Sequence, residues 1–168
     1  YFYTTLNVPV INAGYYVIPP FLSMEILKRE SAYDSELFIE NPSLKIFNSI
    51  FGADIILFTI INKWDKSSIG SKVTVEVEYI IKSTHTNEIL YSRKGTISYN
   101  TSLSTGGSAL LNILASAVNT AATKYVDVAK AANNYIFYDL PKGKYSPMFG
   151  LDKEELAGLK IIKVRLPK

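Results

Sequence analysis

The sequence has no cysteine and only one histidine among its 168 residues. Without cysteine, this chain can form no disulfide, thiol nucleophile or cysteine-rich zinc site. Charged residues make up 20% of the chain and hydrophobic residues 48%, a balance that excludes a disordered polypeptide. Nine glycines and seven prolines are too few for a collagen-like or low-complexity protein. The composition therefore indicates a globular α/β protein that is long enough to bury a core of its own.

A strong charge of either sign is also missing, because 18 basic residues stand against 15 acidic ones. A nucleic-acid-binding protein usually gathers its basic residues into a stripe. The densest basic region here is the C-terminus, where Lys160, Lys163, Arg165 and Lys168 alternate with apolar residues. We interpret it as an exposed strand or tail with solvated lysines, and binding to phosphate or anionic lipid is the alternative. No nucleic-acid partner is expected.

Residue patterns typical of catalysis are scarce. His85 lies among serines and threonines in a predicted turn, and no G-x-S-x-G motif accompanies it. Glu76 and Glu78 share one face of a predicted strand, which alternation makes the solvated face. Phosphate-binding loops and acidic calcium loops are absent from the sequence. We therefore expect a protein that is not an enzyme and that has no cofactor or metal.

The N-terminal half of the chain predicts three helices. Residues 3–13 form a short helical or irregular segment weakened by Pro9, and Gly14 suits a left-handed helix end. A β-type run at 15–18 stops at Pro19 and Pro20, and a second helix follows at 21–30. The third helix begins at Asn41-Pro42 and ends at Gly52, with an apolar face formed by Leu44, Phe47 and Phe51.

Three strands follow. The nearly continuous apolar run at 54–62 predicts a central strand that is covered on both faces. Residues 73–81 and 89–99 alternate between apolar and polar side chains, which predicts two strands with one wet face each. Residues 83–88 connect these two strands as a hairpin loop.

The C-terminal third predicts one long helix over residues 108–134. No charged residue occurs from 95 to 123, but polar side chains recur at intervals of 3, 4 or 7 along the helix. Such a wet stripe is not typical of a membrane-spanning helix. The remaining face is wide and rich in alanine, so we expect self-association or partner docking through Ala121, Ala122 and Tyr125, unless residues 135–168 cover it. A short helix at 153–158 and a last strand at 161–166 complete the prediction.

The predicted fold class is therefore α/β, of the α+β type. Helices pack on a mixed, largely antiparallel sheet, and one long helix lies near the C-terminus. We expect one domain over residues 1–150 and a C-terminal extension over 151–168. Two aromatic groups are candidates for partner contact. The first is Trp64 at the end of the apolar strand, which is either a binding hot spot or a cap on the edge of the core. The second group contains Tyr135, Phe137, Tyr138 and Tyr145.

Four segments occur together in a recognisable order: Gly14-Tyr15-Tyr16-Val17-Ile18-Pro19, Ile50-Phe51-Gly52-Ala53-Asp54, Glu88-Ile89-Leu90-Tyr91, and Gly106-Gly107 before an Ala/Leu-rich stretch. In this order the chain resembles a family of Gram-negative proteins regarded as outer-membrane lipoproteins, whose function is uncharacterised. The domain of that family is similar to the amino-terminal domain of TolB and to the periplasmic part of the curli secretion channel CsgG. The resemblance covers roughly residues 1–150.

The resemblance implies a signal peptide, a lipobox cysteine and a first strand, all ahead of Tyr1. This chain contains none of them, so we expect a truncated or processed N-terminus and a lipid anchor that lies outside the sequence. Tyr91 stands where the family often has tryptophan. The family supplies no catalytic residues.

Together these observations predict a non-enzymatic envelope domain at the outer membrane, facing the periplasm. It would act through contacts with an envelope protein, or with a second copy of itself, in an assembly or secretion-related complex. The alternative is a surface-adhesion or small-ligand-binding module.

Overall fold

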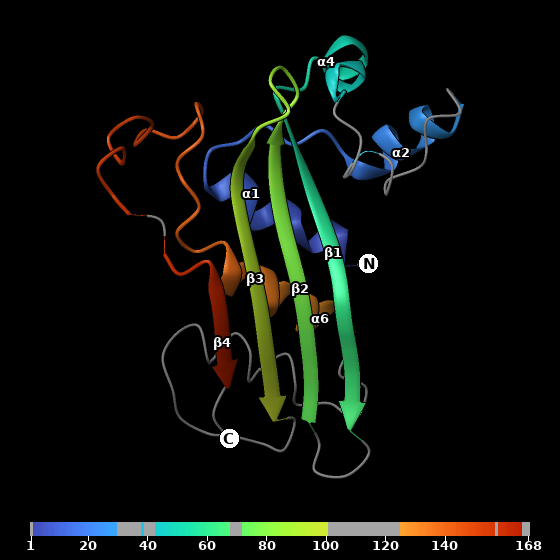
Figure 1. Ribbon diagram of the computed structural model, residues 1–168. Helices are drawn as coiled ribbons and strands as arrows, with labels where there is room; N and C mark the ends of the chain where they lie inside the picture. Colours follow the sequence, from blue (N-terminus) through green and yellow to red (C-terminus); the bar gives the residue numbers. More distant parts are fainter. Residues whose placement is uncertain are drawn as a thin grey trace. The chain divides into compact units, whose positions relative to one another are not determined.

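The computed structural model describes residues 2–29, 38, 43–67, 72–100, 125–156 and 158–165. The elements in these residues, shown in Figure 1, are η1 (Tyr3–Leu6), α1 (Asn7–Asn12), α2 (Pro20–Arg29), α4 (Lys45–Phe51), β1 (Ile55–Ser67), β2 (Lys72–Ser83), β3 (Ile89–Asn100), α6 (Tyr125–Ile136) and β4 (Ile161–Arg165).

The four described strands form one sheet in the order β1-β2-β3-β4. Neighbouring strands β1, β2 and β3 run in alternating directions in Figure 1. Strand β4 lies parallel to β3, with Lys94 opposite Ile161 and Ser98 opposite Arg165. The sheet is therefore mixed and largely antiparallel, which confirms the predicted α+β class.

The chain divides into two compact units. One contains Tyr1–Val17, Ile61–Val77 and Lys94–Lys168, and the other contains Ile18–Ile60 and Glu78–Arg93. We call them the terminal unit and the hairpin unit. Strands β1, β2 and β3 each contribute residues to both. The predicted division into residues 1–150 and 151–168 stays a prediction.

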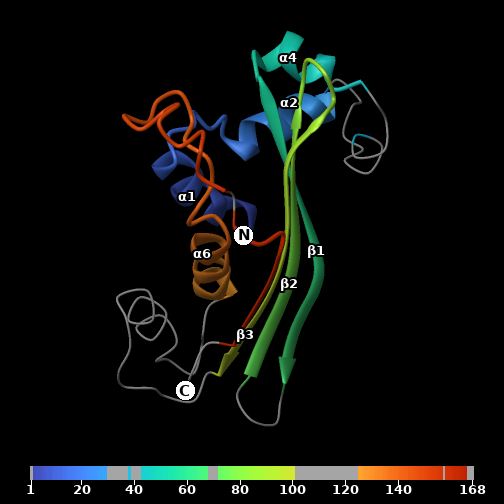
Figure 2. The same cartoon turned by 60° about the vertical axis from the view of Figure 1, so that its left-hand side comes forward.

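The core of the terminal unit lies between its part of the sheet and three short helices. Val75 and Ile97 are buried on the strands, and Ala132 and Ile136 are buried on α6. Helices α1 and α6 lie on one side of the strands in Figure 2. A side chain at Gly95 would collide with Ile136, so this glycine allows α6 to pack directly against β3.

A buried polar network joins α6 to the N-terminus of the terminal unit. Asn133 donates from Nδ2 to Oγ1 of Thr5 over 2.6 Å, and Thr5 donates in turn to the carbonyl of Phe2 over 2.7 Å. Buried polar groups need such partners, because a missing hydrogen bond leaves their desolvation uncompensated. The predicted helical or irregular segment at 3–13 is confirmed as η1 and α1, and Gly14 has the expected positive φ of 90°.

The hairpin unit has a separate apolar core. Leu44, Phe47 and Phe58 are buried at its centre, and the partly buried side chains around them are Leu27, Phe38, Ile46, Phe51, Ile56 and Ile80. The predicted helix at 21–30 is confirmed as α2. The predicted end of α4 at Gly52 is also confirmed, because this residue has a φ of 63° and donates its N–H to Asn48.

The predicted start of α4 is wrong. The helix begins at Lys45 with Leu44 as its N-cap, whereas Asn41 and Pro42 lie outside the described residues. Leucine has no side-chain acceptor, and the N–H of Leu44 is instead bonded to Oδ1 of Asn87, in the hairpin loop.

The predicted strand at 54–62 is confirmed as part of β1, but its central position is wrong. β1 stands at the edge of the four described strands. Its second half carries Lys63, Asp65 and Lys66, charges that typically protect an edge strand from further pairing. Phe58 is buried in the hairpin unit, whereas Ile61 is exposed.

Two other predicted elements are wrong. Residues 15–18 form no strand, because Gly14 and Tyr15 bond to a loop from the C-terminal region and two prolines follow. Residues 153–156 and 158 form no helix, and Asp152 and Asp139 instead bind backbone N–H groups of Lys142 and Gly158. The strand predicted at 161–166 is confirmed as β4.

The long helix is described only in its C-terminal part. Helix α6 begins at Tyr125, and residues 108–124 lie outside the described part of the chain. Among the helices that the structure does describe, none has both the length and the apolar character required to cross a membrane.

Candidate interaction surfaces

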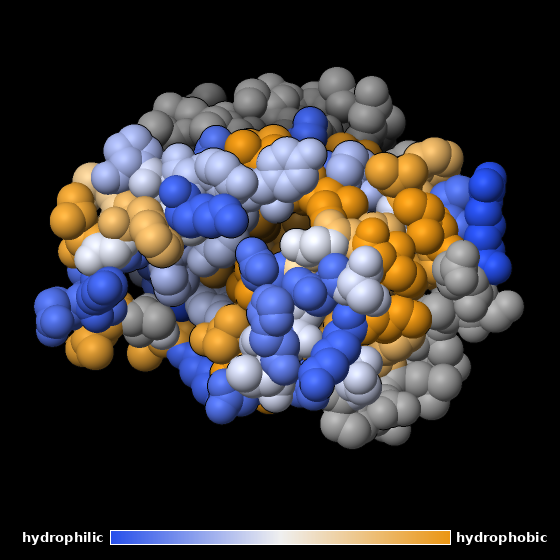
Figure 3. Space-filling view, turned by 90° about the horizontal axis from the view of Figure 1, so that it is seen from above, coloured by the Kyte–Doolittle hydropathy of each residue, from blue (hydrophilic) through white to orange (hydrophobic). Residues whose placement is uncertain are grey.

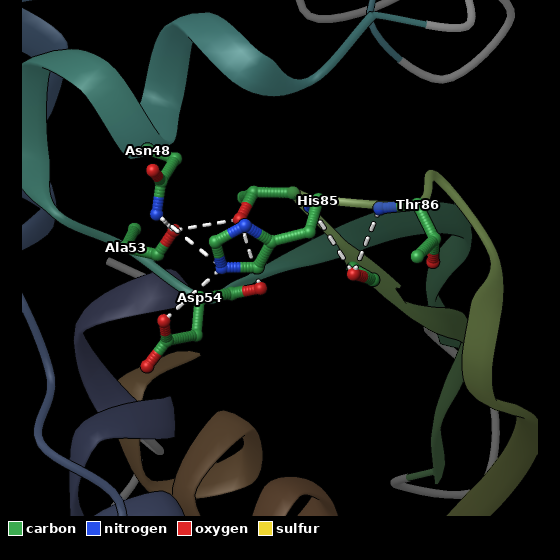
Figure 4. A network of polar contacts seen from close by, with 7 residues as sticks. Asn48, Ala53, Asp54, His85 and Thr86 are labelled. Carbon is green, nitrogen blue, oxygen red and sulfur yellow. Dashed lines mark hydrogen bonds and ion pairs between the residues drawn. The ribbon is translucent and has the colours of Figure 1, made fainter.

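The single histidine lies in a small polar network of the hairpin unit (Figure 4). His85 Nε2 is 3.3 Å from Oδ1 of Asp54 and 3.5 Å from Nδ2 of Asn48. The side chains of His85 and Asp54 are both mostly exposed. Thr84 Oγ1 donates to the carbonyls of Ala53 and Asp54, which fastens the turn to the start of β1. The structure therefore confirms an exposed turn histidine.

Ser83, two residues before His85, holds the backbone of the turn in place. Ser83 Oγ accepts the N–H groups of His85 and Thr86, both at 3.2 Å, and these two bonds shape the turn. A serine nucleophile would need its oxygen directed at a base and at substrate. Ser83 is instead buried and engaged with its own backbone.

Glu76, one of the two glutamates on the predicted solvated face of β2, is likewise unsuited to acid catalysis. Glu76 accepts a 2.7 Å ion pair from Nζ of Lys94 on β3. This hydrogen bond and the positive charge of Lys94 hold the pKa of Glu76 below its usual range. A general acid requires the opposite shift. The described residues also contain no group of three or more histidine, aspartate or glutamate side chains that could hold a metal ion.

Several exposed aromatic side chains of the terminal unit lie in the segment after α6, residues 137–151, which we call the aromatic loop. It folds as a series of tight turns, with N–H bonds from Leu140 to Phe137, from Ser146 to Gly143 and from Phe149 to Ser146. Phe137 and Leu140 are each only 2% exposed and anchor its first part in the core.

The aromatic loop is tied to the segment after α1. Gly143 donates its N–H to Ala13 over 2.8 Å, and Tyr145 donates to Gly14 over 3.0 Å. The hydroxyl of Tyr15 donates to the carbonyl of Pro141 over 2.9 Å. Burial of Tyr15, together with the nearby charge of Asp152, raises the pKa of the phenol, which keeps it a proton donor.

Two glycines permit this close crossing. A Cβ on Gly143 would lie 2.5 Å from the carbonyl oxygen of Gly14, and a Cβ on Gly14 would lie 2.5 Å from Ser146. Because real Cβ atoms do not approach so closely, both positions must lack a side chain for the segments to meet.

Beyond its anchors, the aromatic loop exposes large apolar side chains. Phe149 is 58% exposed and Leu151 70%, and the other exposed members are Tyr138, Tyr145 and Met148. Tyr16 extends the group, since its ring centroid lies 6.5 Å from that of Tyr145. Figure 3 shows hydrophobic side chains at the surface on its left-hand side, beside hydrophilic ones.

The residues predicted for partner contact differ in how far they are buried. Tyr138 and Tyr145 are exposed and Tyr135 is half-buried, whereas Phe137 is buried and anchors the aromatic loop in the core. Partner contact through these residues stays a prediction. The ring of Trp64 is half-buried and meets Phe2 edge-to-face at 5.7 Å, which favours the cap on the core edge. Tyr125 begins α6, while its side chain and residues 121 and 122 lie outside the described part.

Sequence reasoning missed Tyr16, Met148, Phe149 and Leu151. The signal that could have found them is the run Pro147-Met148-Phe149-Gly150-Leu151, which places apolar side chains among turn-forming residues.

The hairpin unit has its own exposed apolar residues. Phe21 on α2 is 78% exposed, and Leu22 beside it is also exposed. We call these two residues the α2 surface. Leu27, five residues after Leu22 on the same helix, packs against the core of the unit. The charges on α2 are of both signs, and Arg29 and Glu25 form an ion pair.

Comparison with known proteins assigns the family. The family model described as "Putative lipoprotein GNA1162-like" matches residues 1–142 of this chain. The chain belongs to this lipoprotein family. The resemblance inferred from the sequence is thereby confirmed at the level of a lipoprotein family, and membership implies a membrane-anchored protein of the cell envelope.

A solved structure supports the assignment. The crystal structure of lipoprotein GNA1162 from Neisseria meningitidis is 26% identical in sequence and matches with a TM-score of 0.51. The match covers 66% of this chain and 76% of that one. A search of the curated proteins gives no match.

Proposed function

We propose that this chain is the non-enzymatic domain of an envelope lipoprotein and acts by binding another protein of the cell envelope. The observation that carries the proposal is the α2 surface. Phe21 and Leu22 are adjacent and exposed on α2, and Leu27 of the same helix is partly buried and packs against the core of the hairpin unit. An exposed aromatic residue on a helix fixed in this way is typical of a binding hot spot.

The surroundings of the α2 surface favour a protein as its partner. Glu25, Lys28 and Arg29 supply charges of both signs along the same helix. Mixed charge around an apolar centre is the usual composition of a protein interface, with its polar rim. A strongly anionic partner would instead favour basic residues alone.

The finer parts of the proposal follow from the family resemblance. We place the protein at the outer membrane, facing the periplasm, with a domain like the amino-terminal domain of TolB. Its partner would belong to an assembly or secretion-related complex similar to the one that contains CsgG, and a second copy of the chain is a possible partner too. The membership of the chain in a lipoprotein family supports the envelope location in this proposal.

Photo-cross-linking in the native envelope tests the proposal. A photoreactive phenylalanine analogue at Phe21 should give one defined product with an envelope protein, or with a second copy of the chain. The same analogue at Lys45, an exposed polar position on α4, is the matched control and should give no such product.

A second variant separates contact from folding. Phe21→Ser combined with Leu22→Ser should abolish recovery of the cross-linked partner and leave thermal unfolding nearly unchanged, since exposed substitutions have small effects on stability. If position 21 gives no specific product while the folded protein is present in the envelope, the proposal fails.

A further inference from the structure

We infer that the exposed tip of the aromatic loop, residues 141–151, contacts the interface of an anionic lipid bilayer. The inference is independent of the proposed protein partner and rests on the terminal unit. It uses the family assignment only for the fact that a lipoprotein is attached to a membrane.

The charges of the tip are the first argument. Lys142 and Lys144 are the only charged residues in the run from Pro141 to Leu151. In the described part of the chain, neither lysine forms an ion pair, and Nζ of Lys144 lies 5.5 Å from the centre of the Tyr145 ring. Anionic headgroups attract such lysines when these lie close to the bilayer surface.

The two aspartates beside the tip accept hydrogen bonds from backbone N–H groups. Asp152 accepts the N–H of Lys142 over 2.6 Å, and Asp139 accepts the N–H of Gly158 over 2.9 Å. Their carboxylates therefore bind the backbone of the terminal unit. Within residues 141–151 themselves the two lysines are the only charged side chains, and the carboxylate of Asp152 lies beside Lys142.

The apolar side chains of the tip are the second argument. Tyr145, Met148, Phe149 and Leu151 are all exposed within seven residues of chain, and Tyr16 adds another exposed ring beside Tyr145. Tyrosine is enriched where a bilayer meets water, because its ring is apolar and its hydroxyl can remain hydrated. Phenylalanine, methionine and leucine supply the apolar area that gains from leaving water.

The rigidity of the tip is the third argument. Its backbone is bonded to Ala13 and Gly14, and the hydroxyl of Tyr15 holds Pro141. A loop whose backbone is already held in place loses little backbone freedom on binding. A lipid anchor also keeps a bilayer at high effective concentration, so a weak contact at the tip is sufficient to orient the domain on it.

Vesicle binding by the 168-residue chain tests the inference. The chain should sediment with vesicles of phosphatidylglycerol and phosphatidylethanolamine and only weakly with vesicles of phosphatidylcholine. Phe149→Ser or Leu151→Ser should each weaken binding roughly tenfold, the loss expected when one large apolar side chain is removed from a buried position. Lys142→Gln with Lys144→Gln should reduce binding roughly tenfold or more on the anionic vesicles alone.

The matched control is Phe21→Ser on the α2 surface. It removes a phenylalanine of the hairpin unit that is even more exposed than Phe149, and it should leave vesicle binding unchanged. It also separates the two proposals, because Phe21→Ser removes the proposed protein contact whereas Phe149→Ser does not.

The absence of cysteine offers a second measurement that does not depend on affinity differences. Phe149→Cys creates a unique site for an environment-sensitive fluorophore. Its emission should shift to shorter wavelength when phosphatidylglycerol vesicles are added, whereas the same label at Phe21→Cys should not respond. A label at position 149 that remains in water, or equal losses of binding in Phe149→Ser and Phe21→Ser, would overturn the inference.

Discussion

The backbone N–H of Leu44 donates a 2.8 Å hydrogen bond to the side-chain oxygen of Asn87, 43 residues further along the chain. Leu44 is the N-cap of α4 and has no side-chain acceptor of its own. The first N–H groups of a helix have no partner within the helix, so they need acceptors from elsewhere. The hairpin between β2 and β3 supplies one of these acceptors, and thereby joins two distant segments of the hairpin unit.

Substitution of Asn87 tests this link. Asn87→Gly keeps the positive φ of 62° accessible but removes the acceptor, so we expect the free energy of unfolding to fall by about 0.5–2 kcal/mol. Asn87→Asp retains an acceptor at the same place and should be close to the wild type. Urea unfolding of the two variants measures the difference, and equal stabilities for both would show that the bond contributes nothing.

The capping by Asn87 also explains why the start of α4 could not be predicted. Asn41-Pro42 is a good local signal for a helix start, and sequence reasoning accepted it. The end of the helix at Gly52 was predicted correctly because that signal is local. The cap at Leu44 comes from a residue on another segment, and no pattern within α4 indicates it.

The polar network around His85 gives a second prediction. His85→Ala removes contacts of 3.3 Å to Asp54 and 3.5 Å to Asn48, but the side chains of His85 and Asp54 are open to solvent. Thr84 still fastens the turn to Ala53 and Asp54. We therefore expect a change of less than about 0.5 kcal/mol in the free energy of unfolding and no loss of function. Thermal unfolding and the yield of the envelope cross-link are the two measurements. A variant that folds normally but has lost its function would contradict the prediction and favour an enzymatic role for His85.

The limits of sequence reasoning are similar in the sheet and in the aromatic loop. The alternation of apolar and polar side chains correctly predicts β2 and β3, because the polarity of each residue indicates which face of the strand is buried. The apolar run of β1 predicts a central strand and the structure gives an edge strand, because the sequence of one strand does not reveal which strands lie on either side of it. The run at 15–18 predicts a strand, but residues 13–15 bond to residues 141–145, more than 120 positions further along the chain, and no local pattern indicates such a contact.

Tyr15 predicts a pH effect on stability. Its burial, and secondarily the charge of Asp152, raise its pKa in the folded protein above the ordinary value of 10.0. Below pH 10.0 the phenol is protonated in both states and its contribution to stability is complete. Above that pH the unfolded chain loses its proton first, so stability falls as the pH rises towards the folded pKa.

Tyr15→Phe should remove this part of the pH dependence. The variant should also lose about 1 kcal/mol at neutral pH, because the bond to Pro141 is gone. Asp152→Asn keeps an oxygen for the N–H of Lys142 but removes the charge, so it should lessen the effect without abolishing it. Urea unfolding from about pH 9 to pH 11 gives the comparison, and parallel curves for the wild type and Tyr15→Phe would contradict it.

The crossing of Gly14 and the aromatic loop gives the last prediction. Gly14 has a φ of 90°, and a Cβ there would lie 2.5 Å from atoms of Ser146. Gly150, in the same loop, also has a positive φ of 77°, but its nearest neighbour would be the flexible end of Lys153 at 3.5 Å. Comparing the alanine variants therefore separates backbone strain from the close approach.

Gly150→Ala should lose about 1–2 kcal/mol of stability, the usual effect of a left-handed conformation on a residue with a Cβ. Gly14→Ala should lose more, because the collision with Ser146 adds to the same strain. If the protein relieves that collision by moving the aromatic loop away from Ala13 and Tyr15, the bonds to Gly143 and Pro141 are weakened too. The variant should then bind phosphatidylglycerol vesicles less tightly than Gly150→Ala at a temperature where both are folded. Equal stability and equal vesicle binding of the two variants would show that the crossing at Gly14 does not hold the loop in place.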